Sequence, residues 1–584
     1  MSYKIVAFAA FVAACGPTAS STGDGGGSDV VGGMCAPGTS RCDGTRRLTC
    51  SDGRWQVAEQ CANVCDDELG CVLCQPGTGT CSGNMSRMCR DDGMGYVDVY
   101  CDPLQGLTCD FEIGVCTGDC APQNLGRNYI GCDYYPTVTG NEVDSAFEFA
   151  VAVSNTTSAV ANVHIEGGAL TAPRTLTVAP GDVAVERLPW VPQLKACNNE
   201  PGGQIECGSP QNLSALVAGG AYHLRSDRPV TVYQFNPLDY KLPGSGCRDG
   251  TAVAGCSYTN DASLLLPVNA MTGNYYVASY PAWPTRTGTI FPSFLTVTGT
   301  ADGTQVTIAP SAATVAGGGL PAFQAGVAQT ITLNAGDVAQ LFSTAGDLTG
   351  SLVRADKPVQ VVSGHYCTEI PHGTTACDHI EESMIPYEAL GNRYLVTPPA
   401  VPPLPNGKVR VVRIIATEPN TTLQYDPPQG ALATTLASAG DFTEVAGTVD
   451  SFLITASAKV LVVQYLEGQE AAGNIGDPAM AVAVPIGQYR TDYQFHAPQN
   501  YTSNYVDIVA PMGANVTLDG VAVTGFSPIG ATGYGVVRQL LSPKPSGNYT
   551  ITGDQPFGIS VYGYGSWTSY FYPGGLDLSP IVVE

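Results

Sequence analysis

Histidine and acidic side chains gather around one short loop of this chain, which Cys367 and Cys377 enclose. His365 lies just before the loop, and Asp378 and His379 follow directly after it. Two imidazoles and a carboxylate form a donor set that could bind a metal ion. The alternative is a polar loop closed by a disulfide, in which Asp378 and His379 cap backbone groups. We favour this alternative and predict no metal and no cofactor.

Further carboxylates recur where repeated segments of the chain begin, at Asp261, Glu382 and Asp477. Their hard oxygen atoms would suit calcium, but no DxDxDG-type loop is present, so calcium stays an open alternative. The chain has six histidines. None of them lies in a nucleophile elbow, a zincin motif or a triad context. We therefore predict that the protein is not an enzyme.

The 21 cysteines of the chain indicate an oxidising compartment. In the second part of the chain they come in close pairs, each enclosing a loop with Gly, Pro or Asn. We predict that each cysteine bonds to its near neighbour. The pairs are Cys120 with Cys132, Cys197 with Cys207, Cys247 with Cys256, and Cys367 with Cys377.

Residues 35–119 contain two tandem units of six cysteines, and each unit begins Cys-x-Pro-Gly-Thr. Units this small cannot bury a sufficient core, so crosslinks must hold them. Six cysteines allow 15 connectivities, and the sequence does not choose among them. A zinc site at Cys71 and Cys74 is the rival, but the two cysteines join separate units and no histidine is near. Such Cys-Pro-Gly units are similar to those in surface lipoproteins of myxobacteria.

The first 14 residues are typical of a secretory signal, because an apolar run follows the single charge of Lys4. The run ends in Val-Ala-Ala-Cys15, which resembles a bacterial lipobox. That resemblance implies a signal peptide at residues 1–14 and lipidation of Cys15. Gly16 follows where a retention signal would place Asp, which implies the outer membrane. Residues 15–34 are rich in Ser, Thr and Gly and predict a flexible linker.

One segment, Gly350–Cys367, organises the rest of the chain. It predicts a β-hairpin, because Asp356, Lys357 and Pro358 separate two runs rich in β-branched residues. Similar segments recur about every 100 to 130 residues, at Tyr222–Phe235, Phe452–Leu466 and Tyr549–Tyr564. A period of that size suits a whole sandwich domain rather than a propeller blade or a solenoid turn.

Other features recur with these segments. A turn with Gly-Asp precedes three of them, at Gly181-Asp182, Gly336-Asp337 and Gly440-Asp441. Three units also open alike with an acidic residue, a proline and a tyrosine. These are Asp261, Pro267 and Tyr275; Glu382, Pro386 and Tyr394; and Asp477, Pro485 and Tyr489. We predict an all-β fold of tandem antiparallel β-sandwich modules after a small disulfide-rich region. The modules span about 134–240, 260–367, 380–467 and 477–565, and how they are arranged stays open.

Several motifs then point to a family. Ser363–Cys367, Ala376–Glu382, Leu390–Val396 and the ending Val561–Gly565 resemble the bacterial form of the IgGFc-binding protein amino-terminal domain. The resemblance covers about residues 120–584 and implies an extracellular, non-catalytic, adhesion-type β domain. The chain lacks mucin-type von Willebrand modules, so antibody binding is not carried over.

The formal net charge of −25 argues against nucleic acid and anionic lipid as partners. We predict an exported, lipid-anchored outer-membrane protein for adhesion or recognition, whose partner is a protein or glycan on another surface. A lectin-like carbohydrate-binding protein is the alternative, and an uncharacterised hydrolase is a weaker one. Trp190, Trp283 and Trp567 could form aromatic platforms for sugars, although core or rim positions are commoner for such residues.

Overall fold

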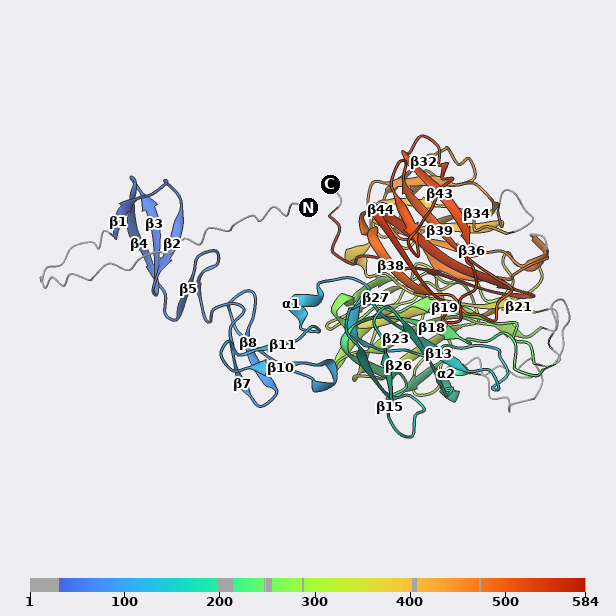
Figure 1. Ribbon diagram of the computed structural model, residues 1–584, viewed down its shortest axis with the longest axis horizontal. Coiled ribbons are helices and arrows are strands. Elements are labelled where there is room, and N and C mark those ends of the chain that lie inside the picture. Colours follow the sequence, from blue (N-terminus) through green and yellow to red (C-terminus); the bar gives the residue numbers. More distant parts are fainter. Residues whose placement is uncertain are drawn as a thin grey trace, which may run out of the picture. The chain divides into compact units, whose positions relative to one another are not determined.

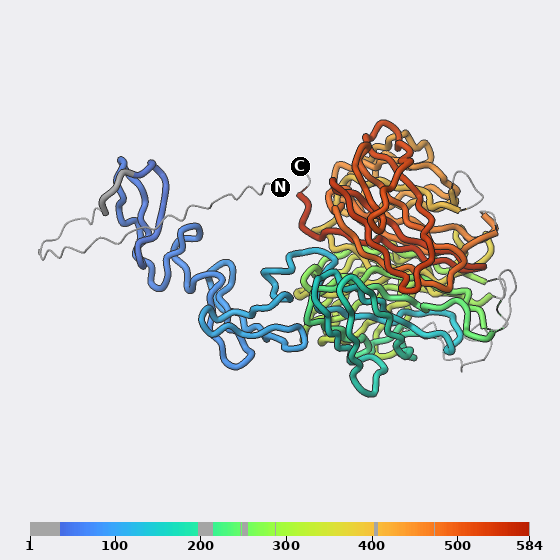
Figure 2. The backbone as a smooth tube through the Cα atoms, viewed as in Figure 1, coloured from blue at the N-terminus to red at the C-terminus, as the bar shows by residue number. Residues whose placement is uncertain are grey.

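The computed structural model describes residues 31–196, 214–245, 247, 255–285, 288–401, 407–471 and 474–582. The described chain is almost entirely antiparallel β-sheet, which confirms the predicted fold class. It divides into two compact units (Figures 1 and 2). The first comprises Met1–Tyr100 and Cys109–Val115, and the second comprises Cys101–Thr108 and Cys116–Glu584.

The first unit is built from short strands held by disulfides. Its strands are β1 (Val31–Met34), β2 (Ser40–Asp43), β3 (Arg46–Ser51), β4 (Arg54–Gln60), β5 (Val64–Asp66), β6 (Gly70–Val72), β7 (Gly79–Ser82), β8 (Met85–Cys89) and β9 (Tyr96–Tyr100). The strands β10 (Thr108–Asp110) and β11 (Val115–Thr117) follow.

Both six-cysteine repeats use one connectivity, in which the first cysteine bonds the third, the second bonds the fifth and the fourth bonds the sixth. The bonds are Cys35–Cys50, Cys42–Cys65 and Cys61–Cys71, then Cys74–Cys89, Cys81–Cys109 and Cys101–Cys116. Cys71 and Cys74 are therefore both consumed in disulfides, which excludes the zinc alternative.

The second unit repeats one arrangement of two packed β layers four times, and we name these repeats sandwiches 1 to 4. Sandwich 1 contains β12 (Gly131–Tyr134), β13 (Phe149–Asn155), β14 (Ala161–Gly167), β15 (Arg174–Val178), β16 (Val183–Leu188) and β18 (Tyr222–Asn236). Sandwich 2 contains β20 (Asn274–Tyr276), β21 (Trp283–Pro284), β22 (Ile290–Phe291), β23 (Ser293–Gly299), β24 (Thr304–Ala309), β25 (Gln329–Leu333), β26 (Val338–Ser343), β27 (Leu352–Ala355) and β28 (Val359–Thr368). β17 (Ala215–Val217) precedes β18 in the chain and pairs with β26.

Sandwiches 3 and 4 follow the same plan. Sandwich 3 contains β30 (Arg393–Val396), β31 (Arg410–Ala416), β32 (Thr421–Asp426), β33 (Thr435–Leu436), β34 (Phe442–Thr448), β35 (Phe452–Ala456) and β36 (Val460–Leu466). Sandwich 4 contains β38 (Arg490–His496), β39 (Ser503–Pro511), β40 (Val516–Leu518), β41 (Val521–Ala522), β42 (Ser527–Pro528), β43 (Tyr534–Leu540) and β44 (Asn548–Gly565). The helices are short: η1 (Pro103–Gln105), α1 (Pro122–Leu125), α2 (Pro192–Lys195), η2 (Val268–Ala270), η3 (Tyr387–Ala389), η4 (Gln469–Ala471) and η5 (Ile486–Gln488).

The prediction of four β-hairpins is wrong. β27 pairs with β20 and β24, whereas β28 pairs with β23 and β29 (Asp378–Ser383), so the two strands never pair with each other. The bend at residues 356–358 instead carries the chain from one layer of the sandwich to the other. Bends of this kind make the corners of β-sandwiches. In sandwiches 1 and 4, the single long strands β18 and β44 make the same crossing.

The four crossing segments nevertheless occupy equivalent places. Beside each one, a buried tyrosine hydroxyl donates a hydrogen bond to a backbone oxygen of the crossing. The pairs are Tyr134 with Val230 (2.6 Å), Tyr275 with Val359 (2.8 Å), Tyr394 with Val460 (2.6 Å) and Tyr493 with Phe557 (2.5 Å). The equivalent tyrosine of sandwich 4 is therefore Tyr493, and the sequence-based choice of Tyr489 is corrected.

The Gly-Asp turns are also equivalent. Gly181, Gly336 and Gly440 have φ of 73°, 80° and 88°. Each donates its backbone N–H to the end of the preceding central strand, to Asn155, Gly299 and Ala416 respectively. Glycine is favoured there because L-residues with a side chain rarely adopt positive φ.

Four inner strands close the second unit into a ring. They are β19 (Asp261–Leu264), β29, β37 (Met480–Val482) and β45 (Thr568–Pro573), and each pairs with the crossing strand of the sandwich before it. Each inner strand also packs against the next, and β45 packs against β19. Where sandwich 4 meets sandwich 1, Tyr129 donates its N–H to Leu576 and Leu578 donates to Arg127. The strands expected to open modules therefore complete the preceding sheet.

Candidate functional site

The residues singled out as possible metal ligands lie at the centre of this ring. Asp378 and His379 are on the inner strand β29, and His365 is on β28 beside it. All three side chains are fully buried. Burial lowers the pKa of His365 well below its usual range, so its imidazole is neutral. The polar residues that flank this loop in the sequence therefore lie in the interior of the β region.

Glu381, two residues after His379 on β29, accepts hydrogen bonds from several side chains. Its oxygens accept from Gln234 Nε2 at 2.8 Å and Asn236 Nδ2 at 3.1 Å, both on β18. The Thr139 hydroxyl also donates to Glu381, and His379 Nε2 lies 3.3 Å from it. Hydrogen bonds of this kind replace the water that a polar group loses on burial. Glu381 therefore joins sandwich 1 to sandwich 2.

Asp261 has the corresponding role for the whole ring. Its Oδ1 accepts from Ala262 N at 2.9 Å and Phe571 N at 3.2 Å. Its Oδ2 accepts from Glu381 N and Met480 N, both at 3.1 Å. One carboxylate thus holds backbone groups of all four inner strands. Burial raises the pKa of the Asp261 carboxyl well above its usual range despite these bonds.

Two further carboxylates lie nearby. Asp378 accepts from Thr568 Oγ1 at 3.4 Å, and burial together with Asp477 and Asp261 raises its pKa well above the usual range. Asp477 accepts from the backbone N–H groups of Ala376 and Gln469, and burial raises its pKa to about 7. Among the residues that the structure describes, no group of three His, Cys, Asp or Glu side chains is placed to hold a metal ion. The arrangement serves to fasten strands together.

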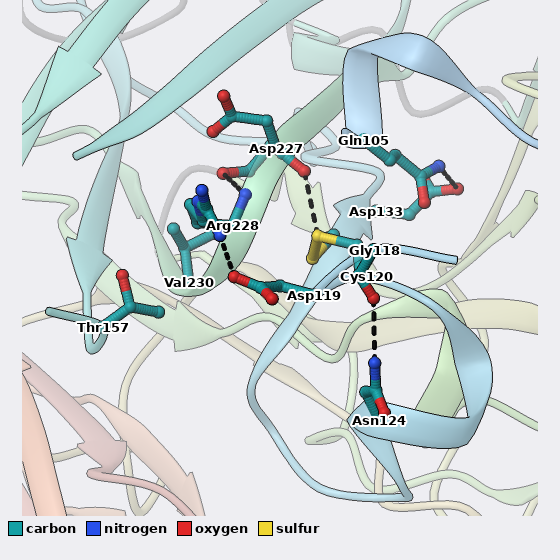
Figure 3. The surroundings of a disulfide bond; sticks show 12 residues. Gln105, Gly118, Asp119, Cys120, Asn124, Asp133, Thr157, Asp227, Arg228 and Val230 are labelled. Carbon is teal, nitrogen blue, oxygen red and sulfur yellow. Dashed lines mark hydrogen bonds and ion pairs between the residues drawn. A yellow bond between two sulfur atoms is a disulfide. The ribbon is translucent and has the colours of Figure 1, made fainter. Parts of the chain in front are cut away.

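The disulfides of the β region link near neighbours. Cys120 is bonded to Cys132, Cys247 to Cys256, and Cys367 to Cys377. Figure 3 shows Cys120 beside the bend of β18, where Asp119 forms an ion pair with Arg228. The sulfur of Cys120 also lies 3.3 Å from the carbonyl of Ser226. Cys15, Cys197 and Cys207 lie outside the described residues.

The tryptophans considered as sugar platforms are all half-buried. Trp190 packs against Phe149 and donates its indole N–H to Phe147 O at 2.6 Å. Trp283 packs against Phe291, with ring centroids 5.7 Å apart. Trp567 donates its backbone N–H to Gln469. Their contacts are those of rim residues within the fold.

Sequence reasoning missed a cleft of about 530 Å³ between sandwiches 1 and 4. One wall is formed by β16 and the residues after β18, and the other by loops that flank β38 and β44. The lining residues are Val185, Glu186, Arg187, Leu238, Asp239, His496, Pro498, Gln499, Asn500, Pro545 and Ser546. The walls are more than 250 residues apart in the chain, so only the closure of the ring creates this cleft.

Ion pairs and amides compensate the charges of the cleft. Arg187 bonds to Asp239, and Asn500 Nδ2 donates to the same carboxylate at 2.7 Å. Glu186 is paired with Arg174 at 2.5 Å. Burial lowers the pKa of His496 to about 4, so that imidazole is neutral at physiological pH. The cleft offers hydrogen-bonding groups beside apolar side chains, without an uncompensated charge among these residues.

Comparison with known proteins identifies the family. A family model described as IgGFc binding protein matches residues 261–563, which is more than half of the chain. The chain belongs to the IgGFc-binding protein family. The match to that family begins at the first residue of β19 and ends within β44, so it spans the inner strands β19, β29 and β37.

A curated human protein named IgGFc-binding protein is 35% identical to this chain over 138 residues. The aligned part is 24% of this chain and only 2% of the human protein. The IgGFc-binding family takes its name from binding rather than from a catalytic activity. Together with nine disulfides among the described residues, this family indicates an extracellular protein. No helix in the described part of the chain is long and apolar enough to span a bilayer.

Proposed function

We propose that this protein is a lipid-anchored surface protein that recognises a protein on another surface through its ring of four sandwiches. The family match to residues 261–563 is the observation that carries this proposal, because the family is named for binding. The buried centre supports a non-catalytic role. The carboxyl groups of Asp261 and Glu381 are closed off from solvent and bonded to the strands that they join.

The proposed anchor is a lipid on Cys15 at the outer membrane, reached through the flexible linker of residues 15–34. Several acyl chains on one cysteine would hold the protein firmly, because two lipid signals suffice where one does not. Metabolic labelling with an alkyne fatty acid tests this directly. The wild-type chain incorporates the label and fractionates with membranes, whereas Cys15→Ser loses the label. Equal labelling of both forms would overturn the lipid anchor.

The identity of the partner is a separate proposal. The name of the human relative states that it binds the Fc region of IgG. The 138 residues that match this chain are only a small part of that human protein. We therefore propose a protein partner on a neighbouring cell or matrix, and we do not assign Fc to this chain. Binding of the chain to purified Fc is measured beside its binding to extracts of cell surfaces.

Photo-crosslinking tests the binding role. The full chain is purified with its disulfides, labelled with a photoreactive reagent on surface lysines, applied to intact target cells and irradiated. We expect discrete crosslinked proteins whose yield falls when unlabelled full chain competes. A heat-denatured, reduced sample of the same chain is the control. Adducts that persist under competition, or that the denatured control also forms, would contradict specific recognition.

A further inference from the structure

The strand β16 forms an open edge of sandwich 1. It ends the sheet order β15-β14-β18-β13-β16 and pairs only with β13 among the described strands. The ladder starts where Asn155 N donates to Asp182 O at 2.9 Å. Hydrogen-bonded residues alternate in an antiparallel pair, so Ala184, Glu186 and Leu188 face β13 with their backbone groups. The backbone groups of Val183, Val185 and Arg187 consequently face away from the sheet.

The equivalent edge strands of the other three sandwiches show what kind of strand can pair with this edge. The equivalents of β16 are β26, β34 and β43, because each flanks the central strand of its sandwich. On β26 the outer edge is covered by β17, a three-residue antiparallel strand that pairs with Val338–Gln340. On β43 it is covered by β42. Two of the four equivalent edges therefore carry a short added strand within the described chain.

The Gly-Asp turns align these edges residue by residue. Asp182 corresponds to Asp337, so Val185 corresponds to Gln340, which pairs with Ala215 of β17. On β16, the outward groups at both ends of this stretch are engaged. Arg187 O accepts from Arg174 Nη1 at 2.6 Å, and Val183 N donates to the Asn548 side-chain oxygen at 2.8 Å in its favoured amide orientation.

Between these two ends lies Val185. Its backbone N–H and C=O have no hydrogen-bond partner among the described residues. Val185 is 38% exposed, so a partner can reach these groups. Unpaired edge groups are a ready template for another strand.

The cleft lies directly against this open stretch of edge. Val185, Glu186 and Arg187 form part of its wall, and Leu238 and Pro498 add apolar surface. Its volume of about 530 Å³ is within the range of sites that hold a small ligand or a few side chains. The Oδ1 atom of Asn500 is buried there without a hydrogen-bond donor among the described residues. A ligand that brings an uncharged donor would satisfy it.

We propose that an extended peptide segment of a partner protein adds to β16 as an antiparallel strand, in the place that β17 takes on β26. The segment pairs with the N–H and C=O of Val185. One of its residues, with a hydroxyl or amide donor such as Ser, Thr or Asn, points into the cleft toward Asn500. Main-chain pairing gives affinity in such complexes, and the side-chain pocket gives specificity. This inference rests on the proposed function, because it presumes a protein partner.

A peptide library and two substitutions at one position test the proposal. Val185→Pro removes the outward N–H and leaves the pairing with β13 intact, and proline is tolerated on an edge whose N–H faces solvent. Val185→Thr is the matched control, because it changes the side chain and keeps the N–H. Phage-displayed random peptides are selected on the full-length wild-type chain, and the selected peptides are then measured on all three forms.

We expect Val185→Pro to weaken the selected peptides by roughly tenfold or more, and Val185→Thr to bind within about threefold of the wild type. A second measurement needs no protein variant. N-methylation of the peptide amide that faces Val185 C=O lowers affinity, whereas N-methylation of an adjacent amide that points away does not. Melting curves verify that the three forms are folded.

Any one of the following results would overturn the inference. The first would be a library that yields no peptide on the wild-type chain, and the second would be peptides that bind Val185→Pro as well as the wild type. The third would be glycans that bind the cleft and depend on Asn500 but not on the N–H of Val185. The fourth would be a dimer of the chain that Val185→Pro dissociates, which would assign the edge to a second copy. If Val185→Pro still crosslinks to target cells like the wild type, the proposed function stands and the edge inference fails.

Discussion

Asp261 lies where four strands from distant parts of the chain meet, and its carboxylate accepts backbone hydrogen bonds from all of them. The side chain is fully buried. A buried donor that loses its acceptor costs about 1–3 kcal/mol, so the effect of removing Asp261 is spread over several strands at once. The recurrence of acidic residues at these places in the sequence is explained by their role as acceptors for strand ends.

We expect Asp261→Ala to lower the free energy of unfolding by about 3 kcal/mol or more, because three backbone N–H groups on other strands lose their acceptor. Asp554→Ala is the matched control, since this exposed carboxylate accepts hydrogen bonds from the nearby Asn515. The control changes stability by about 0.5 kcal/mol or less. Calorimetric melting compares the two. Equal melting temperatures for the two variants would contradict a central role for Asp261.

Asp477 gives a prediction about pH. Burial raises its pKa from 3.8 to about 7, so the folded protein binds its proton more tightly than the unfolded chain does. Its contribution to stability is therefore complete below pH 4 and is lost as the pH rises toward 7. Asp477→Asn stays neutral at every pH. We expect the melting temperature of this variant, relative to wild type, to rise by several degrees between pH 4 and pH 8. A difference that does not change with pH would show that Asp477 does not titrate in this way.

Removal of divalent ions addresses the metal alternatives considered for His365, Asp378 and His379. Because all three side chains are buried, and Asp378 and His379 are hydrogen-bonded to neighbouring side chains, we expect EDTA to leave the melting temperature within about 1 °C of its original value. Dialysis against EDTA, followed by readdition of calcium or zinc, is the measurement. A fall of several degrees that either ion reverses would place a metal in the structure.

At the scale of elements, the strands were more predictable than their partners. The runs of β-branched residues on either side of residues 356–358 are the strands β27 and β28, as the sequence predicted, because that pattern depends only on neighbours in the chain. Pairing could not be predicted in the same way. The bend at residues 356–358 suits either a hairpin or a crossing between layers, and the choice depends on strands such as β23 and β24 that lie elsewhere in the sequence.

The repeated tyrosine at each crossing provides a test of equivalence. Each hydroxyl donates to a carbonyl beside the bend, so Tyr→Phe removes one buried hydrogen bond and leaves that oxygen without its donor. We expect Tyr134→Phe, Tyr275→Phe, Tyr394→Phe and Tyr493→Phe each to cost about 1–2 kcal/mol. Tyr96→Phe, at an exposed site of the disulfide-rich unit, is the control. Melting temperatures report the losses. If Tyr489→Phe lowered stability by about 1–2 kcal/mol and Tyr493→Phe had no effect on it, the sequence-based choice of Tyr489 as the equivalent tyrosine would be correct.

At the scale of the whole molecule, closure of the ring determines both the buried centre and the cleft. His365, Asp378 and His379 lie on the paired strands β28 and β29, on either side of the disulfide between Cys367 and Cys377. The sequence could not show that this disulfide loop faces Asp261 and Asp477, since those residues are about 100 residues away on either side. The cleft between β16 and the loops of sandwich 4 was unpredictable for the same reason.

Recognition of a protein on another surface is the central claim, and saturation binding of the labelled full chain to intact cells tests it most directly. A panel of bacterial and animal cells is compared before and after treatment of the targets with protease, and separately after periodate oxidation of their glycans. The account predicts saturable binding to at least one surface that protease abolishes and periodate leaves intact. Binding that survives protease and is lost after periodate, or no saturable binding on any surface, would contradict it.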